Sequence, residues 1–290
     1  MNKSMIKIIC TIMLPFAIMA CTETNYGDEN VTRITKSDLD PSFTVVSVSA
    51  NKYKLTPANN KNVILSEFDL GVGSFSNFNI GDTLFLPDAG TYNIRHFVAG
   101  AGGISSDTIS KTIIVAVSDP IKGNLVVGGK FANPADVAKW TIGGSGSGAG
   151  VWTFTSGTTL GKATLTAGGY AGNGIYQAIN VTGGFNYKID MLVSSTTGLS
   201  DSWFEVYCDY TNPATVSGDY SAGGTLYSIN TWNGSGKTPF SGEISVVGTS
   251  TTLNGVFTAT KTGTVYLVIR GGGNDMQGGV SVTNVEFRRM

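Results

Sequence analysis

The stretch Ser202–Tyr210, with the sequence SWFEVYCDY, combines the alternation of a β-strand with an unusual mixture of aromatic and acidic side chains. Successive side chains of a strand point to opposite faces of its sheet. One face of this strand therefore carries Phe204, Val206, Cys208 and Tyr210. The other face carries Trp203, Glu205, Tyr207 and Asp209. The first set is apolar enough for a hydrophobic core, so we expect that face to be buried.

The second face of this strand places flat aromatic rings beside hydrogen-bond acceptors. A sugar has an apolar C–H face and a rim of hydroxyl groups, so such a face suits a glycan. The alternative is a strand covered on both sides, with Trp203 and Tyr207 in a second layer of core and the carboxylates at its edge. Aromatic residues favour strands for packing reasons alone, so the sequence leaves both interpretations open.

Neighbouring stretches supply further residues for a glycan-binding face. Alternation over residues 264–270 places Arg270 on the face opposite to the apolar side chains of that stretch. There its guanidinium donors suit sugar hydroxyls near Glu205, or else form a plain surface ion pair with Glu205. Trp232 and Trp152 lie beside glycine-rich loops, where exposed aromatic residues are often functional. We assign Trp140 to the core.

Binding through stacked rings requires several of these residues to converge. One stacked sugar face buries on the order of 100 Å² of apolar surface, about 2.5 kcal/mol before the costs of association. A single ring therefore binds weakly, and two or three rings are needed. The predicted glycan-binding residues are Trp203, Glu205, Tyr207, Trp232, Tyr227, Trp152 and Arg270.

The start of the chain has the pattern of an export signal. Two lysines precede an apolar run that Pro15 interrupts and that is too short to span a bilayer, so residues 1–20 are expected to be a signal peptide. The run ends in Ile18-Met19-Ala20-Cys21, which resembles the lipobox of bacterial lipoproteins. The resemblance implies that Cys21 is the lipidated mature N-terminus and attaches the protein to the membrane. An ordinary cleaved signal is the alternative.

Charge and cysteine content narrow the possible partners. Removal of residues 1–20 takes away two lysines and leaves 17 basic and 20 acidic residues, a net charge of −3. This balance, without a basic stripe, argues against nucleic acid. Cys10 leaves with the signal and Cys21 would be acylated, so Cys208 has no partner for an intrachain disulfide. Acidic residues soon after Cys21 resemble the surface-export signal of some Gram-negative lipoproteins.

The rest of the chain consists of short alternating runs between Gly, Asn and Pro turns, which predicts an all-β fold. Residues 21–41 are polar and without a strong period, and predict a flexible tether. Residues 119–124 combine Pro, Gly and polar side chains and predict a linker. We therefore expect a small β-sandwich over residues 42–118 and a larger jelly-roll β-sandwich over residues 125–290.

Two stretches of the first sandwich carry a recognisable motif. They are FDLGVGS at Phe68–Ser74 and AGTYNIRHFVAGAGGISSDTISKTIIV at Ala89–Val115. They resemble the PKD (polycystic kidney disease) type of immunoglobulin-like domain, although Phe68, Leu70 and Val72 depart from its Trp-Asp-Phe-Gly-Asp-Gly motif. The resemblance implies an immunoglobulin-like spacer domain without chemistry of its own.

Three stretches of the second sandwich carry another motif: Asn124–Phe131 followed by Trp140, then Gly174–Val193, and finally Val280–Phe287. They resemble carbohydrate-binding modules of families 4 and 22. The resemblance implies a jelly-roll sandwich that holds glycan chains on a sheet face or across its loops. Such modules often carry a structural calcium, but Ala132 and Asn284 stand where acidic ligands would be, which argues against calcium. No other cofactor is expected.

The sequence offers little support for catalysis. Glu205 and Asp209 are four residues apart on one strand, roughly 13 Å by strand rise, too far for the carboxylate pair of a glycosidase. A carboxylate from another strand leaves a glycoside hydrolase as an alternative. His96 is the single histidine, and we interpret it as a structural or surface side chain. GGSGSGAG at residues 143–150 lacks the helix that a dinucleotide-binding loop requires, so it is interpreted as an inter-strand loop.

The layout resembles the accessory glycan-binding lipoproteins of polysaccharide utilisation systems. That resemblance implies a non-catalytic, lipid-anchored outer-membrane protein that faces the cell exterior. It would hold a polysaccharide for separate hydrolases, other surface glycan-binding proteins and a glycan importer. The implied ligand is a β-glucan such as β-1,3-glucan (laminarin), or xylan. An adhesive or structural surface protein with a protein ligand is the alternative, because exposed aromatic residues suit both.

Overall fold

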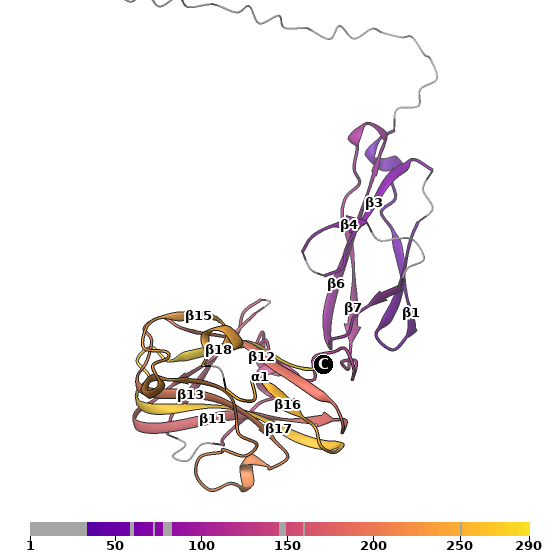
Figure 1. The fold of residues 1–290 in the computed structure, drawn as a ribbon. Coiled ribbons are helices and arrows are strands. Elements are labelled where there is room, and N and C mark those ends of the chain that lie inside the picture. The colour runs from indigo at the N-terminus through magenta and orange to yellow at the C-terminus, as the bar shows by residue number, and fades with distance from the viewer. Residues whose placement is uncertain are drawn as a thin grey trace, which may run out of the picture.

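The computed structural model describes residues 34–58, 61–71, 73–77, 83–144, 149–158, 160–249 and 251–290. The predicted signal peptide, the lipidation site Cys21 and most of the tether lie outside these residues. The described residues form mainly antiparallel strands (Figure 1), which confirms the predicted all-β fold. Within them, no helix has the length and apolar character needed to cross a membrane.

The first sandwich packs the sheet β1-β2-β5 against the sheet β4-β3-β6-β7. Its elements are η1 (Lys36–Asp38), β1 (Phe43–Ser49), β2 (Lys52–Pro57), β3 (Val63–Asp69), β4 (Ser76–Asn77), β5 (Thr83–Phe85), β6 (Gly90–Gly100), η2 (Ala101–Gly103) and β7 (Ile109–Val115). The core between the sheets includes Phe43 and Leu55 from one side and Phe68, Ile94 and Ile113 from the other. Alternating apolar side chains on these strands account for the burial.

His96 lies inside this first sandwich. Its ring stacks on Phe68 with 4.1 Å between ring centroids, and its two nitrogens lie within hydrogen-bond distance of Ser66 Oγ (2.9 Å) and the Pro41 carbonyl oxygen (2.5 Å). Burial lowers the pKa of His96, although the hydrogen bond to Pro41 opposes the shift. The side chain is fully buried, so its role is structural.

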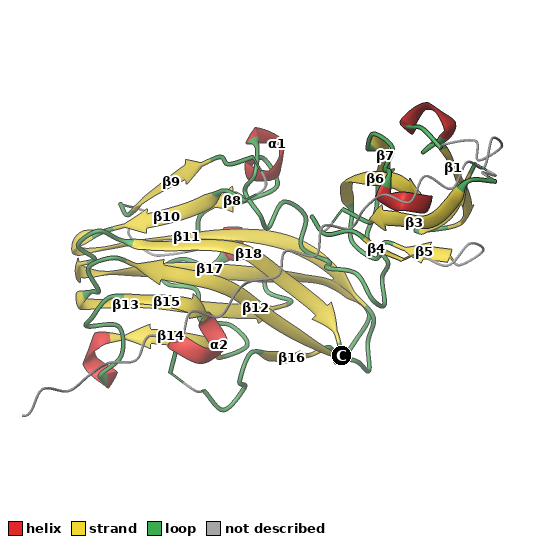
Figure 2. Ribbon diagram, turned by 90° about the horizontal axis from the view of Figure 1, so that it is seen from above, coloured by secondary structure: helices red, strands yellow, loops and turns green. Residues whose placement is uncertain are grey.

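The second sandwich packs the sheet β15-β12-β18-β10-β9, with β16 also paired to β12, against the sheet β14-β13-β17-β11-β8. Figure 2 shows the long strands of both sheets aligned along a common axis, with neighbouring strands antiparallel. The elements are α1 (Pro134–Val137), β8 (Thr141–Ile142), β9 (Val151–Thr155), β10 (Lys162–Thr166), β11 (Gly168–Val181), β12 (Asn186–Ser195), β13 (Ser200–Asp209), η3 (Pro213–Thr215), β14 (Thr225–Asn230), η4 (Thr231–Asn233), β15 (Phe240–Glu243), α2 (Ile244–Val247), β16 (Val256–Thr258), β17 (Gly263–Asp275) and β18 (Val280–Arg289).

The main core lies between these two sheets and contains one face of β13, as the alternation of Ser202–Tyr210 predicted. Phe204, Val206 and Cys208 are buried there, and Trp140 is buried in the same core. We call the opposite side of the sheet β14-β13-β17-β11-β8 the outer face. It carries the other alternating set of β13.

Two short apolar stretches of the second sandwich are not strands. Ile244–Val247 form the short helix α2, because Ile244 and Val247 pack on the core at helical spacing while Val246 is exposed. Residues 125–127 are not a strand, since the side chain of Gln177 binds the Val127 N–H (2.8 Å) and carbonyl (2.8 Å) in place of a neighbouring strand.

The junction between the sandwiches is held by a bidentate ion pair. Arg288 of β18 donates from both terminal nitrogens to Asp88, at 2.8 Å each. Asp88 also accepts from the backbone N–H of Asn124 (2.7 Å) in the linker segment. The Asn124 side chain in turn binds the backbone of Val285 and Phe287 in β18. These contacts connect the linker segment to both sandwiches.

Candidate functional site

The outer face brings together residues of β13 and β17. The register pairs Glu205 with Arg270, Trp203 with Gly272, and Tyr207 with Val268. Because side chains alternate along both strands, Trp203, Glu205, Tyr207 and Arg270 lie on one side of the sheet. Four of the seven predicted glycan-binding residues therefore converge.

Arg270 is the centre of this cluster. Its Nη2 donates to Glu205 Oε2 (3.0 Å) and to the Tyr207 hydroxyl (3.2 Å), and Nη1 lies 3.1 Å from Asp219 Oδ1. Its guanidinium carbon lies 4.4 Å from the ring centroid of Trp203 and 4.9 Å from that of Tyr207. The guanidinium is thus in cation–π contact with both rings.

The surroundings make this cluster rigid and largely dry. Arg270 is only 6% exposed, and the Glu205 side chain is 16% exposed. Tyr207 donates its hydroxyl hydrogen to Glu205 Oε2 (2.7 Å) and accepts from Thr225 Oγ1 (3.2 Å). Arg270 Nε makes no hydrogen bond to any described residue. A buried donor without a partner is costly, so this nitrogen is a position where a water or a ligand oxygen would be stabilising.

The connection between β13 and β14 covers one end of the outer face. Tyr220 of this connection is fully buried and packs edge-on against Tyr207, with 6.1 Å between ring centroids. Together with Val268 they form a small second core. Tyr207 is therefore only 4% exposed, and burial raises the pKa of its hydroxyl. Our prediction that Tyr207 contacts the glycan is wrong in this structure: its hydroxyl contacts Glu205 and Arg270 while its ring is covered, and the covered-strand alternative holds at this end.

Two further predicted residues belong to the main core. Alternation in β9 sends Trp152 inward, where it is buried despite the glycine-rich loop before it. Tyr227 pairs with Val206 and points to the inner face, where its hydroxyl donates to the Ile189 carbonyl (3.0 Å). Neither ring is available for stacking, so the prediction is wrong for both. Tyr227 shares the inner face with its partner Val206, and the register shift after that pair brings Thr225 opposite Tyr207 on the outer face.

The other end of the outer face is open. Trp203 is partly exposed and lies opposite Asn230 at the end of β14. The Asn230 side chain accepts from the backbone N–H of Trp232 (3.0 Å) and caps the turn η4. Thr231 Oγ1 binds both backbone groups of Ser202, at 2.9 and 3.1 Å. These bonds hold Trp232, which is 57% exposed, beside the strand that carries Trp203.

Tyr170 is an exposed ring that the sequence patterns did not single out. It lies near the start of β11 and is 72% exposed. Its signal in the sequence is an aromatic residue between glycines, in GGYAG at residues 168–172. The motif at Gly174–Val193 begins after this residue and therefore does not indicate it.

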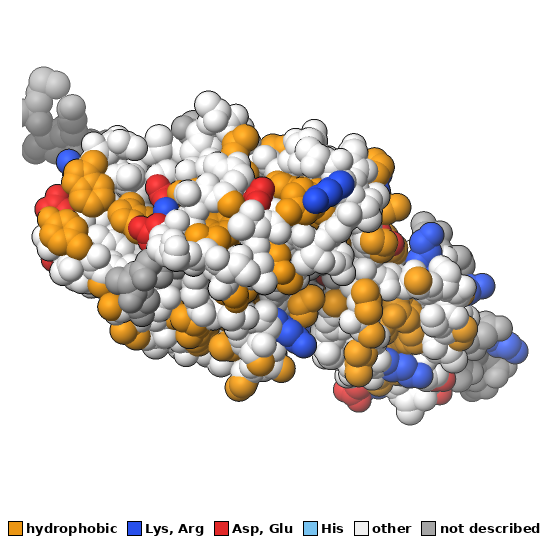
Figure 3. All heavy atoms as spheres, turned by 90° about the horizontal axis from the view of Figure 1, so that it is seen from below, with side chains coloured by type: hydrophobic (Ala, Val, Ile, Leu, Met, Phe, Trp, Pro, Cys, Tyr) orange, Lys and Arg blue, Asp and Glu red, His pale blue; other side chains and the backbone are white. Residues whose placement is uncertain are grey.

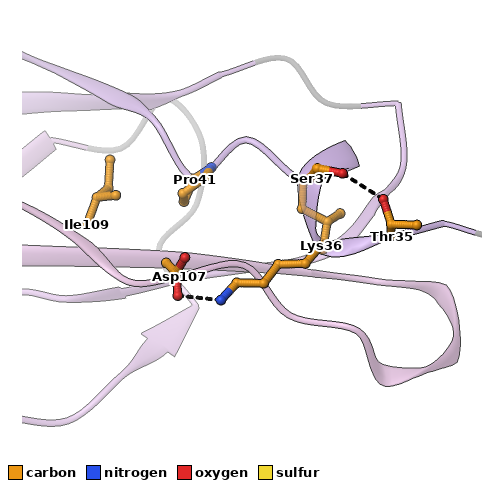
Figure 4. A pocket seen from close by; sticks show the side chains of 7 residues that line it. Thr35, Lys36, Ser37, Pro41, Asp107 and Ile109 are labelled. Atoms are coloured by element: carbon orange, nitrogen blue, oxygen red, sulfur yellow. Dashed lines mark hydrogen bonds and ion pairs between the residues drawn. The ribbon is translucent and has the colours of Figure 1, made fainter.

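Other parts of the described chain offer no comparable site. No three His, Cys, Asp or Glu side chains in the described ranges are grouped to hold a metal. A shallow groove on the first sandwich is bounded by the ion pair between Lys36 and Asp107 (Figure 4). Its lining lacks aromatic rings and buried charges; it consists of Thr35, Lys36, Ser37, Leu39, Pro41, Asp107 and Ile109.

No protein-family model and no curated protein matches the chain. A β-sandwich carbohydrate-binding module described as promiscuous in specificity is 14% identical, with 86% of this chain and 97% of that chain covered and a TM-score of 0.34. A carbohydrate-binding module in complex with β-1,4-galactotriose is 13% identical (58% and 99% covered, TM-score 0.31). The enzymatically active domain of a bacteriophage CBA120 tailspike is 14% identical (61% and 23% covered, TM-score 0.37). All three scores lie below 0.5, so we base no argument about ligand or activity on them.

Proposed function

We propose that the second sandwich binds a polysaccharide at the open end of its outer face and has no catalytic activity of its own. The observation that carries this proposal is that the exposed Trp232 follows Thr231, which is bonded to the residue before the partly exposed Trp203, with the Glu205–Arg270 pair two residues further along β13. Aromatic faces stack on the C–H faces of sugars, and a carboxylate with a guanidinium offers acceptors and donors to the hydroxyl groups.

The charges around Arg270 favour binding over hydrolysis. A glycosidase needs one carboxyl group that is protonated before the reaction. Glu205 and Asp219 both contact Arg270, and Glu205 Oε2 also accepts from the Tyr207 hydroxyl. Carboxylates held by these donors are placed to accept hydrogen bonds, whereas a general acid has to donate a proton to the glycosidic oxygen.

The surface favours a glycan over a large protein partner. On the face drawn in Figure 3, hydrophobic side chains form separate patches among backbone and uncharged side chains, with few charged groups. A protein interface more often presents a contiguous apolar patch. Scattered rings among hydroxyl and amide groups suit a hydroxyl-rich ligand.

We further propose that the protein is a lipoprotein anchored through Cys21 on the outer membrane and faces the cell exterior. There it would present a β-glucan, with laminarin as the first candidate, to separate hydrolases and an importer. This part rests on the sequence at residues 18–21. The Cys21→Ala variant is expected to leave the membrane fraction, and its retention there would contradict the anchor.

Affinity electrophoresis of the chain from Thr22 onward tests glycan binding directly. The gels would contain laminarin, xylan or no polysaccharide, with bovine albumin as a non-binding protein. We expect retardation by at least one polysaccharide, and loss of most of it in Trp203→Ala and Trp232→Ala. Val246→Ala removes an exposed apolar side chain from α2 and serves as the matched control. Unchanged mobility of the wild-type protein in every gel would refute the proposal.

A further inference from the structure

Tyr170 lies in a β-bulge of β11. The pairing of β11 with β17 runs from Gly168 opposite Asp275 to Ala171 opposite Gly273, so β11 has one residue more than its partner between these pairs. Such bulges re-aim side chains and are common beside binding sites. The ring is 72% exposed, so packing does not account for its position.

The backbone of Tyr170 is in a conformation that a large side chain rarely adopts. Its φ is +62°, in the left-handed region that normally favours glycine, and the preceding Gly169 has a φ of +61°. Strained residues of this kind persist where the surrounding structure fixes them, and they cluster at ligand-binding positions. A third glycine in this turn would be less strained, but the position carries a tyrosine.

Tyr170 stands at the same end of the sandwich as the two tryptophans. Ala171 is opposite Gly273, Gly273 is opposite Ser202, and Ser202 is bonded to Thr231 beside Trp232. Three inter-strand spacings of about 4.8 Å therefore separate the bulge from η4, roughly 14 Å in total.

Strand β17, which lies between Tyr170 and Trp203, presents little side-chain bulk to an extended ligand. β17 has three consecutive glycines, 271–273, so Gly272 places no side chain beside Trp203. The next residue, Asn274, lies opposite the bulge and is an exposed polar side chain beside Tyr170. The glycines also let the strands approach closely, since a Cβ on Gly272 would lie only 2.5 Å from the Ala171 carbonyl oxygen. A path across the sheet from Tyr170 past Trp203 to Trp232 thus meets no large apolar side chain on β17, and Asn274 offers an amide to sugar hydroxyl groups along it.

We propose that Tyr170 is a second stacking platform, and that the polysaccharide crosses the strands at this end so that internal sugars contact both Tyr170 and Trp232. This inference rests on the proposed glycan binding and adds the direction of the chain and a minimum ligand length. Because the platforms are several sugar rings apart, a disaccharide reaches only one of them. The bound ligand is then a stretch within a chain, and a free chain end is not required.

The test compares Tyr170→Gly with Tyr170→Phe by isothermal titration with laminarin, a β-1,3-linked hexasaccharide and the disaccharide. Loss of one stacked ring is expected to weaken binding of the polymer and the hexasaccharide about tenfold in Tyr170→Gly. The disaccharide should bind both variants and the wild type equally, and Tyr170→Phe should keep wild-type affinity. Since glycine relieves the strained φ, the thermal midpoint of Tyr170→Gly should be unchanged or raised by about 2 °C.

The outcomes separate this inference from the proposed function. If Trp203→Ala and Trp232→Ala lose binding while Tyr170→Gly retains it for the polymer, glycan binding holds and the second platform is refuted. A lowered thermal midpoint together with unchanged affinity would make Tyr170 a structural residue, which also overturns the inference. If wild-type protein binds neither laminarin nor its hexasaccharide in titration and xylan does not retard it in gels, both proposals fail together.

Discussion

Arg270→Met tests whether the outer-face cluster is a buried ion network or an ordinary surface pair. Methionine keeps much of the aliphatic stem but removes the charge. Glu205 then loses its cation while it keeps the hydrogen bond from Tyr207. Breaking a fully buried pair costs roughly 3–5 kcal/mol, and the remaining hydrogen bond and partial exposure of Glu205 reduce this to about 2 kcal/mol. Loss of the cation–π contacts with Trp203 and Tyr207 adds about 1 kcal/mol.

The expected total is therefore about 3 kcal/mol, or a decrease of about 6–12 °C in thermal midpoint for a domain of this size. Urea unfolding followed by tryptophan fluorescence measures it, because all four tryptophans lie in the second sandwich. The double variant Arg270→Met/Glu205→Gln removes both charges and should recover most of the 2 kcal/mol. Arg288→Met, at a more exposed pair, is the matched control and should cost about 0.5–1 kcal/mol. A loss below about 0.5 kcal/mol for Arg270→Met, or no recovery in the double variant, would refute the buried network.

Three other predictions concern titratable groups. Burial acts to raise the pKa of Asp88, but hydrogen bonds from Arg288 and the Asn124 backbone outweigh it and hold the pKa below its usual value. Its stabilisation is thus present above about pH 4 and lost as the pH falls through the lowered folded-state pKa, so thermal midpoints of wild type and Asp88→Asn should differ at pH 7 and converge in acid. Burial lowers the pKa of His96, so the first sandwich should be fully stable above about pH 6.5 and should lose stability as the pH falls towards the folded-state pKa. Hydrogen exchange of residues 43–115 measures this loss. The His96→Phe variant should show a weaker dependence of stability on pH. Burial raises the pKa of the Cys208 thiol, so in the chain from Thr22 onward an aromatic disulfide reagent should react with it only on unfolding, and fast reaction of the native protein would contradict its burial.

Alternation was sufficient to predict which side chains of β13 and β17 share a face. Side-chain direction in a strand follows from residue parity, so Trp203, Glu205 and Arg270 were placed correctly without knowledge of the register. The same rule fails where parity changes. The register shift after Val206 brings Thr225, which has the parity of the inward Tyr227, opposite Tyr207 on the outer face, and the bulge before Ala171 interrupts the alternation beside the exposed Tyr170. Neither irregularity has a signal in the local sequence strong enough to be predicted.

Burial of the rings could not be predicted from the strands at all, because it depends on loops. Tyr207 has the same parity as Trp203, yet Tyr220 from the connection 210–224 covers it and leaves Trp203 partly exposed. That connection carries proline and several glycines, so its path is set by contacts with the sheet. Trp152 shows the reverse case, in which a position beside a glycine-rich loop suggested exposure while strand parity determined burial.

The covered end and the open end of the outer face serve one purpose. A polar group binds a ligand well only if its own rotamer is fixed before the ligand arrives. The small core of Tyr207, Tyr220 and Val268 excludes water from one side of Arg270, and the Tyr207 hydroxyl fixes Glu205. At the open end the rings of Trp203 and Trp232 lie beside polar groups that lose little further freedom on binding. The glycan interpretation of the strand and its packing alternative therefore each apply to one half of the same face. The packed half fixes the side-chain conformations of Arg270 and Glu205, which lie next to the half proposed to bind the glycan.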